Sequence, residues 1–399
     1  MKGNMRFCVP CLFGVEGLVA QELRDMGLEQ VQAENGRVLF SGGWEAMVRA
    51  NLCCRFGERV LLLLGEFPAR SFEELFQGVK ALPWEGLLGK EDAFPVTGSS
   101  LSSQLHSVPD CQAIIKKAIV ERLKAKYKLS WFAESGALHR VRFRILKDQV
   151  SVLVDTSGEG LHKRGYRALS NDAPMKETLA ASLCQLSRLR QDGHLIDPFC
   201  GSGTIIIEAA TIACNMAPGL NRRFGFERFR GFDSTAWQRI KKEARMAVNF
   251  DVPVNLAGSD ISTLIVDRAQ KNAVLAGISQ WVNEGKVRFT ACDAREVQPS
   301  SETPGLIVTN PPYGEQSNPK SASVASMMKN VADNLKRNFA GWAVWMLTSD
   351  RELPRQMRLK ESKKIVFFNG PLECRFFRFA MTAGSNRKED VSQKETSSD

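Results

Sequence analysis

Short apolar runs alternate with helical patterns along the second half of the chain. Four runs end in polar residues, at 194–199, 255–260, 287–292 and 306–309, and three more follow at 342–348, 365–368 and 375–381. Helical spacing of apolar residues occupies 204–216, 262–276 and 323–338. Apolar strands that alternate with helices are typical of an α/β domain with a parallel sheet covered on both faces. Ligands of such sheets bind at the carboxyl ends of the strands.

The first half of the chain has a different pattern. An extended apolar stretch at 7–13 and a helical pattern at 15–25 precede two alternating segments, 30–33 and 37–40. These flank Asn35-Gly36, a strong hairpin signal. A helix, a strand at 59–64 and another helix follow within 44–95, and further strands surround a basic helix within 93–155. This order predicts small α+β modules ahead of the α/β domain.

The composition fits a globular chain of two or three domains. It has 399 residues, 43% hydrophobic and 25% charged, which excludes a collagen, a coiled coil or wholesale disorder. We find no apolar run of the ~18–20 residues that a membrane span needs and no good signal peptide. Ten cysteines are too sparse for a disulfide scaffold, so we expect a cytoplasmic protein. The polar tail 384–399 is expected to be disordered.

Positive charge is concentrated in one block. Residues 1–110 contain 10 Lys and Arg against 14 Asp and Glu, whereas residues 111–170 contain 13 against 5. The block holds a lysine-rich helix, an alternating Arg strand at 139–147 and a basic linker at 161–167. It indicates a surface for nucleic-acid phosphates, although a solvated helix and an edge strand share this pattern. The residues predicted to contact phosphates are Lys116, Lys117, Lys124, Lys126, Lys128, Arg140, Arg142, Arg144, His162, Lys163, Arg164 and Arg167.

A glycine-rich loop follows the first strand of the α/β half. It reads Asp-Pro-Phe-Cys-Gly-Ser-Gly-Thr over 197–204 and leads into an apolar helix. Gly201 and Gly203 permit a tight turn, and the helix start supplies an anion site. A dinucleotide fingerprint would require a third glycine where Ile206 stands, so the loop suits one carboxylate better than a pyrophosphate, and Asp197 could hold a cationic amine. An ordinary turn is the plainer interpretation.

Two further loops carry an acid at the end of a strand. Asp260, followed by Ile261, stands where a ribose diol is commonly held. Asp293, followed by Ala294, could accept a hydrogen bond from an exocyclic amine such as that of adenine, or cap a helix. The 63 residues between Asp197 and Asp260 imply an insertion, which includes an Arg- and Phe-rich segment at 221–232. This segment could stack on single-stranded nucleic acid or serve only for packing.

The fourth loop reads Asn310-Pro311-Pro312-Tyr313. Prolines lack an N–H donor and stiffen the loop, which leaves carbonyls and the Asn310 side chain as acceptors. Acceptors on the N–H groups of a base amine favour tetrahedral nitrogen and align it with a methyl donor, and Tyr313 offers a stacking face. We therefore predict that these four residues position a base amino group, although an Asn-Pro-Pro turn can be a simple loop.

These motifs, in this order, resemble class I S-adenosylmethionine-dependent methyltransferases. The sequence LHKRGYR, followed by APMKETLAASL, more closely resembles the THUMP-domain RNA guanine-N2 methyltransferases, a family that includes the amino-terminal half of bacterial large-subunit rRNA methyltransferases. The resemblance covers nearly the whole chain and implies a Rossmann-like domain with a mostly parallel seven-stranded sheet. It implies a ferredoxin-like domain at 1–55, a THUMP domain at 56–165 and the methyltransferase domain at 166–383.

The resemblance also implies the ligands and the site. S-adenosylmethionine is expected at Asp197, Phe199, Cys200, Gly201, Gly203, Thr204, Asp260, Ile261, Asp293, Ala294 and Asn310. The expected activity is methylation of guanine N2 in RNA, 23S rRNA above all, by direct displacement without a covalent enzyme intermediate. The alternatives are tRNA guanine-N2 or adenine-N6 methylation, or a non-catalytic role in ribosome assembly. No metal is expected, although Cys8, Cys11, Cys53 and Cys54 leave zinc as an alternative to simple strand cysteines.

Overall fold

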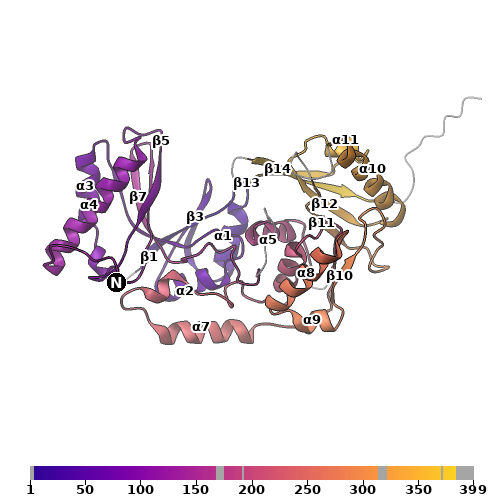
Figure 1. The fold of residues 1–399 in the computed structure, drawn as a ribbon, viewed down its shortest axis with the longest axis horizontal. Helices are drawn as coiled ribbons and strands as arrows, with labels where there is room; N and C mark the ends of the chain where they lie inside the picture. The colour runs from indigo at the N-terminus through magenta and orange to yellow at the C-terminus, as the bar shows by residue number, and fades with distance from the viewer. Residues whose placement is uncertain (1–3, 168–174, 191–192, 313–320, 370–371, 383–399) are drawn as a thin grey trace, which may run out of the picture.

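The computed structural model describes residues 4–167, 175–190, 193–312, 321–369 and 372–382. The tail expected to be disordered, 384–399, lies outside them. The two halves of the chain form two separate mixed sheets that stand side by side, with the amino-terminal half at the left of Figure 1. No described helix is both long enough and apolar enough to cross a membrane.

The amino-terminal half is built on one seven-stranded sheet in the order β2-β3-β1-β4-β7-β6-β5. The Asn35-Gly36 hairpin is confirmed, with Gly36 at φ 73° between β2 and β3. Strand β4 pairs with β1 on one side and with β7 on the other, so a single ladder runs through both predicted modules. The strands are β1 (Met5–Pro10), β2 (Glu29–Glu34), β3 (Arg37–Gly42), β4 (Leu61–Pro68), β5 (Val96–Leu101), β6 (Val141–Leu146) and β7 (Gln149–Asp155).

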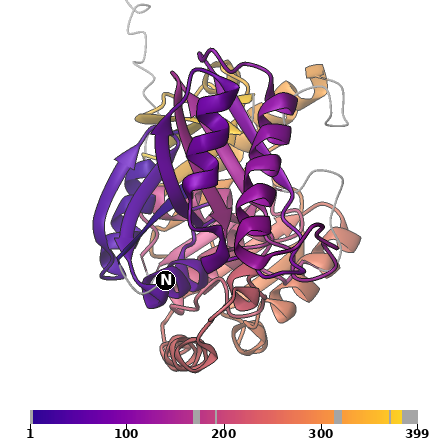
Figure 2. The same cartoon turned by 90° about the vertical axis from the view of Figure 1, so that its left-hand side faces the viewer.

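Helices α3 (Phe72–Ala81) and α4 (Val108–Tyr127) cover one face of the β5–β7 end of this sheet (Figures 1 and 2). Val141, Phe143 and Ile145 of β6 are buried in the same core as the apolar side of α4. Because side chains alternate along a strand, Arg142 and Arg144 lie on the opposite face. Helices α1 (Glu16–Asp25) and α2 (Trp44–Cys53) complete the other end of the module.

The carboxyl-terminal half confirms the predicted Rossmann-like class, with strand order β10-β9-β8-β11-β12-β14-β13. The described ladders are parallel except where β14 pairs antiparallel with β12 and β13. The strands are β8 (His194–Asp197), β9 (Asn255–Asp260), β10 (Val287–Ala291), β11 (Leu306–Thr309), β12 (Ala343–Thr348), β13 (Lys363–Asn369) and β14 (Leu372–Ala380). The helices are α5 (Glu177–Leu186), α6 (Thr204–Ala213), α8 (Thr263–Leu275), α9 (Ser279–Asn283), α10 (Ser321–Asn338) and α11 (Leu353–Gln356).

The Arg- and Phe-rich insertion joins the two halves. Phe224, Phe226 and Phe229 are buried, and the backbone N–H of Phe226 donates to the carbonyl of Thr156 at the end of the amino-terminal sheet. The insertion continues into α7 (Ser234–Met246), which lies along α2 (Figure 1). The packing interpretation therefore holds for these aromatic rings, because buried rings cannot stack on nucleic acid.

Candidate functional site

Four neighbouring parallel strands end at the same edge of the carboxyl-terminal sheet. Asp197 closes β8 and Asp260 closes β9, and the registers place Asp197 beside Gly258 and Asp260 beside Ala291. Strand β11 pairs with β8 on the other side and ends just before Asn310. The loops predicted to bind cofactor and substrate are thus brought together, as the carboxyl edge of such a sheet requires.

The glycine turn has the geometry predicted from the sequence. Gly201 has φ 52° and Gly203 φ 84°, both in the left-handed region that glycine adopts freely. A Cβ on Gly203 would stand 3.0 Å from both Ala269 and Phe289, whereas no heavy atom beyond the chain neighbours lies within 4 Å of a Cβ on Gly201. Gly203 therefore serves packing, and Gly201 leaves open space at the edge of the sheet.

Asp197 is buried and shares its carboxylate with two donors. The Thr309 hydroxyl donates to Oδ1 over 2.6 Å, and the Phe199 backbone N–H donates to the same oxygen over 3.1 Å. Burial raises the pKa of Asp197 to about 7, although these hydrogen bonds lower it. A cationic ligand amine at this carboxylate would stabilise its ionised form.

The next two loops differ from each other. Asp260 accepts the backbone N–H of Ser262, and the adjacent Ile261 side chain is 73% exposed. Asp293 is engaged by Arg295, which donates to both of its carboxylate oxygens and lowers its pKa. The predicted contact of Asp293 with an adenine amine must therefore share this carboxylate with Arg295.

The fourth loop holds an unpaired acceptor. The Oδ1 atom of Asn310 is buried and has no hydrogen-bond partner among the described residues. Pro311, which is buried, and Pro312 follow it. Tyr313, predicted to stack on the base, lies outside the described residues.

The cysteines show no sign of thiolate or metal chemistry. Burial raises the pKa of the Cys200 thiol well above its usual value, and its backbone N–H donates to the Ser259 carbonyl. Burial likewise raises the pKa of Cys8 and Cys53 to about 11 and of Cys11 to about 12. Across the described ranges, no three His, Cys, Asp or Glu side chains form a group that could hold a metal.

The basic block does not form one surface. Helix α4, which carries the lysines, covers one face of the sheet. Arg142 and Arg144 point to the opposite face. Lys116 is also tied down, donating to the Phe94 carbonyl and pairing with Glu134. Helix α4 and strand β6 therefore present their cations to opposite sides of the sheet.

The basic linker contains one buried arginine, Arg164. Arg164 is only 4% exposed and pairs with the buried Glu208 of α6, to which Tyr166 also donates. Its other guanidinium contacts are the carbonyls of Leu161 and Arg55. Arg164 therefore joins the two halves of the protein and cannot reach a phosphate, contrary to its prediction as an RNA contact.

Arg167 has a role that the sequence did not reveal. Its Nη2 donates to the Thr204 hydroxyl over 2.8 Å, and it pairs with Glu177. Thr204 is the first residue of α6, directly after the glycine turn. The basic linker thus contacts the glycine-rich loop. Arg167 and Thr204 are 37 residues apart, so no local sequence pattern predicts this contact.

These residues fit S-adenosylmethionine. The open space at Gly201, the exposed apolar Ile261 and the carboxylates of Asp197 and Asp260 lie at one edge. An apolar side chain suits an adenine face, a carboxylate suits a ribose diol, and a buried carboxylate suits an amine. The open space, the two carboxylates and the apolar side chain are therefore compatible with this cofactor.

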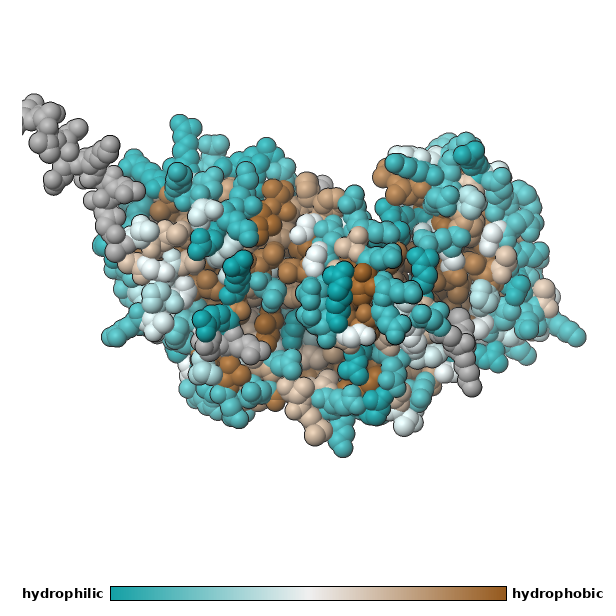
Figure 3. Space-filling view, turned by 180° about the vertical axis from the view of Figure 1, so that it is seen from behind, coloured by the Kyte–Doolittle hydropathy of each residue, from teal (hydrophilic) through white to brown (hydrophobic). Residues whose placement is uncertain are grey.

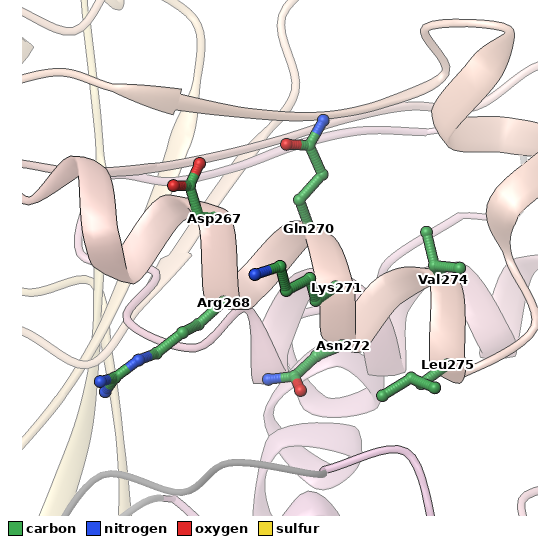
Figure 4. Close-up of a pocket in the computed structure, with 7 residues that line it drawn as sticks. All are labelled: Asp267, Arg268, Gln270, Lys271, Asn272, Val274 and Leu275. Carbon is green, nitrogen blue, oxygen red and sulfur yellow. The ribbon is translucent and has the colours of Figure 1, made fainter.

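A hollow of about 490 Å³ lies elsewhere, along α8. Its described lining comes from this helix alone and includes Asp267, Lys271 and Leu275 (Figure 4). It contains none of the carboxylates or acceptors at the strand ends, and we assign it no part in the chemistry.

Comparisons with known proteins agree with the fold. The RMKL-like methyltransferase domain matches residues 164–378, the RlmL ferredoxin-like domain residues 6–61 and the THUMP domain residues 69–155. The chain is 40% identical to the putative RNA methyltransferase YpsC of Bacillus subtilis, over 94% of this chain and 96% of that protein. It is 34% identical to the ribosomal RNA large subunit methyltransferase K/L of Psychromonas ingrahamii, over 98% of this chain but 52% of that protein.

The chain therefore spans about half the length of the K/L relatives that it matches. Among solved structures, SMU.472, a putative methyltransferase complexed with SAH, superposes with a TM-score of 0.87 at 36% identity, covering 96% of this chain and all of that one. The protein belongs to the THUMP-domain, RMKL-like family of class I S-adenosylmethionine-dependent methyltransferases.

Proposed function

We propose that this protein transfers a methyl group to the exocyclic N2 amino group of a guanine in RNA, with 23S rRNA as the favoured substrate. The observation that carries the proposal is the unpaired acceptor of Asn310, which directly follows β11, the strand that pairs with β8 ahead of the glycine turn. A buried acceptor without a donor is costly. A purine amino group brings two N–H donors to such a loop.

The chemistry follows from the residues of this loop. The lone pair of a guanine amino group is delocalised into the ring, so the nitrogen is a poor nucleophile. An acceptor at Asn310 and carbonyls of the donor-free prolines favour tetrahedral nitrogen and hold it in line with the methyl group. When bound, S-adenosylmethionine supplies an electrophilic methyl group. No thiolate is needed, which agrees with the high pKa of Cys200.

RNA as the substrate is supported by the THUMP match and by the names of the relatives. Exposed cations on the amino-terminal half, such as Lys126 and Lys163, supply charge for phosphates. The target base must leave its stack, at a cost of about a few kcal/mol, which is smallest in a loop or a partly melted strand.

Adenine N6 is the second candidate acceptor, because the Asn-Pro-Pro-Tyr sequence also resembles that of adenine-N6 methyltransferases. Both amines would use the Asn310 acceptor, so nucleoside analysis must separate them. A tRNA guanine and a non-catalytic role in ribosome assembly are tested by the same experiment.

The test is methyl transfer from labelled S-adenosylmethionine to 23S rRNA from a strain that lacks this protein, with tRNA from the same strain in parallel. Mass spectrometry of the nucleosides should find N2-methylguanosine in the rRNA. Asn310→Ala should abolish more than about 99% of the rate. The matched control is Asn283→Ala, at the exposed end of α9. An active Asn310→Ala enzyme, or N6-methyladenosine as the product, would overturn the proposal.

A further inference from the structure

Two hollows share a wall where the two halves of the protein meet. One has a volume of about 640 Å³ and is lined by the basic linker, the start of α5 and the beginning of the insertion. The other, of about 430 Å³, is lined by Arg140 and by the insertion as far as Arg228. Glu159 and Arg223 line both. We call the combined hollow, formed chiefly by 158–167 and 222–228, the junction groove. Figure 3 shows the molecule from behind, with hydrophilic side chains over much of the surface and a notch in its upper outline.

The junction groove carries an excess of positive charge. Its described lining contains eight Lys and Arg against three Glu. Glu159 forms an ion pair with Lys163, and Glu177 forms one with Arg167, both within the groove. Glu227 accepts a hydrogen bond from the Phe224 backbone N–H. Arg223 and Arg228 are exposed, and neither has an ion-pair partner in the part of the chain that the structure describes.

Arg222 makes one wall of the groove rigid. Its guanidinium donates to the carbonyls of Ser157, Glu159, Gly160 and Lys163 over 2.6–3.3 Å, which fixes the linker against the insertion. Its Nε has no partner among the described residues, and neither has the Nε of Arg167. Burial, together with the cations Arg164 and Arg59, lowers the pKa of Arg222 to about 10. The four acceptors of Arg222 are all carbonyls, and among the described residues no carboxylate forms an ion pair with it.

One end of the junction groove lies next to the THUMP sheet, and the other end lies next to the glycine-rich loop. At one end Arg140 stands directly before β6, whose Arg142 and Arg144 continue along the face that α4 leaves uncovered. At the other end Arg167 lines the groove and donates to Thr204 of the cofactor loop. A chain of cations thus leads from the THUMP sheet to the edge where the methyl group is transferred.

From this geometry we propose that the junction groove binds the sugar-phosphate backbone of a single RNA strand that leads to the target base, with Arg223 and Arg228 as phosphate contacts. The inference rests on the proposed function and adds the route of the substrate. A single strand is favoured because the target base must be unpaired. Arginine suits this task, since its planar guanidinium matches a phosphate with two parallel donors.

The experiment combines Arg223→Ala with Arg228→Ala and measures binding to undermethylated 23S rRNA at several salt concentrations. We expect affinity to fall by about tenfold and the slope against log salt to flatten by about 0.7 per lost cation. In methyl transfer the KM for RNA should rise while kcat stays close to that of the wild type, and cofactor affinity should not change. The matched control is Arg355→Ala on α11, whose side chain is 89% exposed.

The double variant Arg223→Lys, Arg228→Lys keeps both charges and should retain the salt slope, which a merely structural role would not explain. Unchanged RNA affinity and slope in the Ala variant, with a normal melting curve, would overturn the inference. A wild-type protein that binds this RNA through the groove but methylates none of it would overturn only the proposed function. A wild-type protein that binds no RNA would overturn both.

Discussion

The Thr309 hydroxyl donates to Oδ1 of Asp197 over 2.6 Å and thereby joins the carboxyl ends of β11 and β8. This bond stabilises the ionised carboxyl, and its loss should raise the pKa of Asp197 above its value of about 7. We expect Thr309→Val to weaken S-adenosylmethionine binding at pH 7.5 by about tenfold, whereas Thr309→Ser should preserve it. Calorimetric titration checks this, and equal affinities of the two variants would contradict the role assigned to the hydroxyl.

Cofactor binding should depend on pH through Asp197. Only the ionised carboxyl attracts a cationic amine, so affinity should fall by up to about tenfold for each pH unit below the pKa. Asp197→Asn should bind weakly and without this dependence between pH 6 and 8.5. Asp251→Asn, an exposed carboxyl outside the site, is the control.

The same pKa has a consequence for stability without cofactor. Because burial raises the pKa of Asp197 above that of the unfolded chain, its stabilising contribution is complete below about pH 4 and is lost as the pH rises through about 7. Ligand-free Asp197→Asn should therefore unfold at a higher temperature than the wild type at pH 8. A lower unfolding temperature would contradict the cause we give for the pKa.

The two glycines of the turn should respond differently to alanine. Gly203→Ala places a Cβ against Phe289 on a backbone that is also left-handed, and should cost about 1–3 kcal/mol of stability. Gly201→Ala meets no atom and should cost about 1 kcal/mol through its left-handed backbone, but it narrows the open space and should weaken cofactor binding. Urea unfolding and cofactor titration of both variants separate the effects, and identical behaviour would refute the assignment.

Glu208 should be a strong determinant of stability. It is buried against Arg164 and Tyr166, so Glu208→Ala leaves a buried guanidinium without its counter-ion and should cost about 3–5 kcal/mol. Glu243→Ala is a matched control, because this carboxylate pairs with arginines at the exposed surface of α7 and should matter little. Equal effects of the two substitutions in urea unfolding would show that burial of the pair is unimportant.

The two faces of the THUMP sheet should contribute unequally to RNA binding. Arg144 lies on the face that continues into the junction groove, whereas Lys126 lies on α4, which covers the other face. We therefore expect Arg144→Ala to weaken RNA binding more than Lys126→Ala does. Filter binding at two salt concentrations checks the order, and the reverse order would place the RNA on the helical side.

Strands and helices with a periodic apolar pattern could be predicted from the sequence. The distant residues that they contact in the fold could not. All seven strands of the second sheet were expected, because buried strands leave continuous apolar runs. Helix α7 was missed because only Trp237 and Ile240 are buried in an otherwise charged segment. Its start carried a signal nonetheless, since Asp233 caps the helix through the Thr235 and Ala236 N–H groups.

The candidate site could be predicted where its residues directly follow the strands of the parallel sheet. Asp197, Gly201, Asp260 and Asn310 come together because parallel strands share one carboxyl edge. The fate of Arg164 was not predictable from its neighbours, because a run of basic residues is typical of an exposed segment. Its partner was visible only as Glu208, a single acid within the apolar helix that follows the glycine turn.

Strand β4 hydrogen-bonds to β1 through Leu61–Leu63 and to β7 along its whole length. A truncation at residue 60 would expose β1 at the edge of one fragment and the leucine-rich β4 at the edge of the other, and bare strand edges promote aggregation. The strands from β1 to β7 consequently belong to one structural unit for recombinant expression. A movement of the amino-terminal half relative to the methyltransferase domain would have to bend the linker and the insertion, because the ladder that joins β1, β4 and β7 contains no hinge.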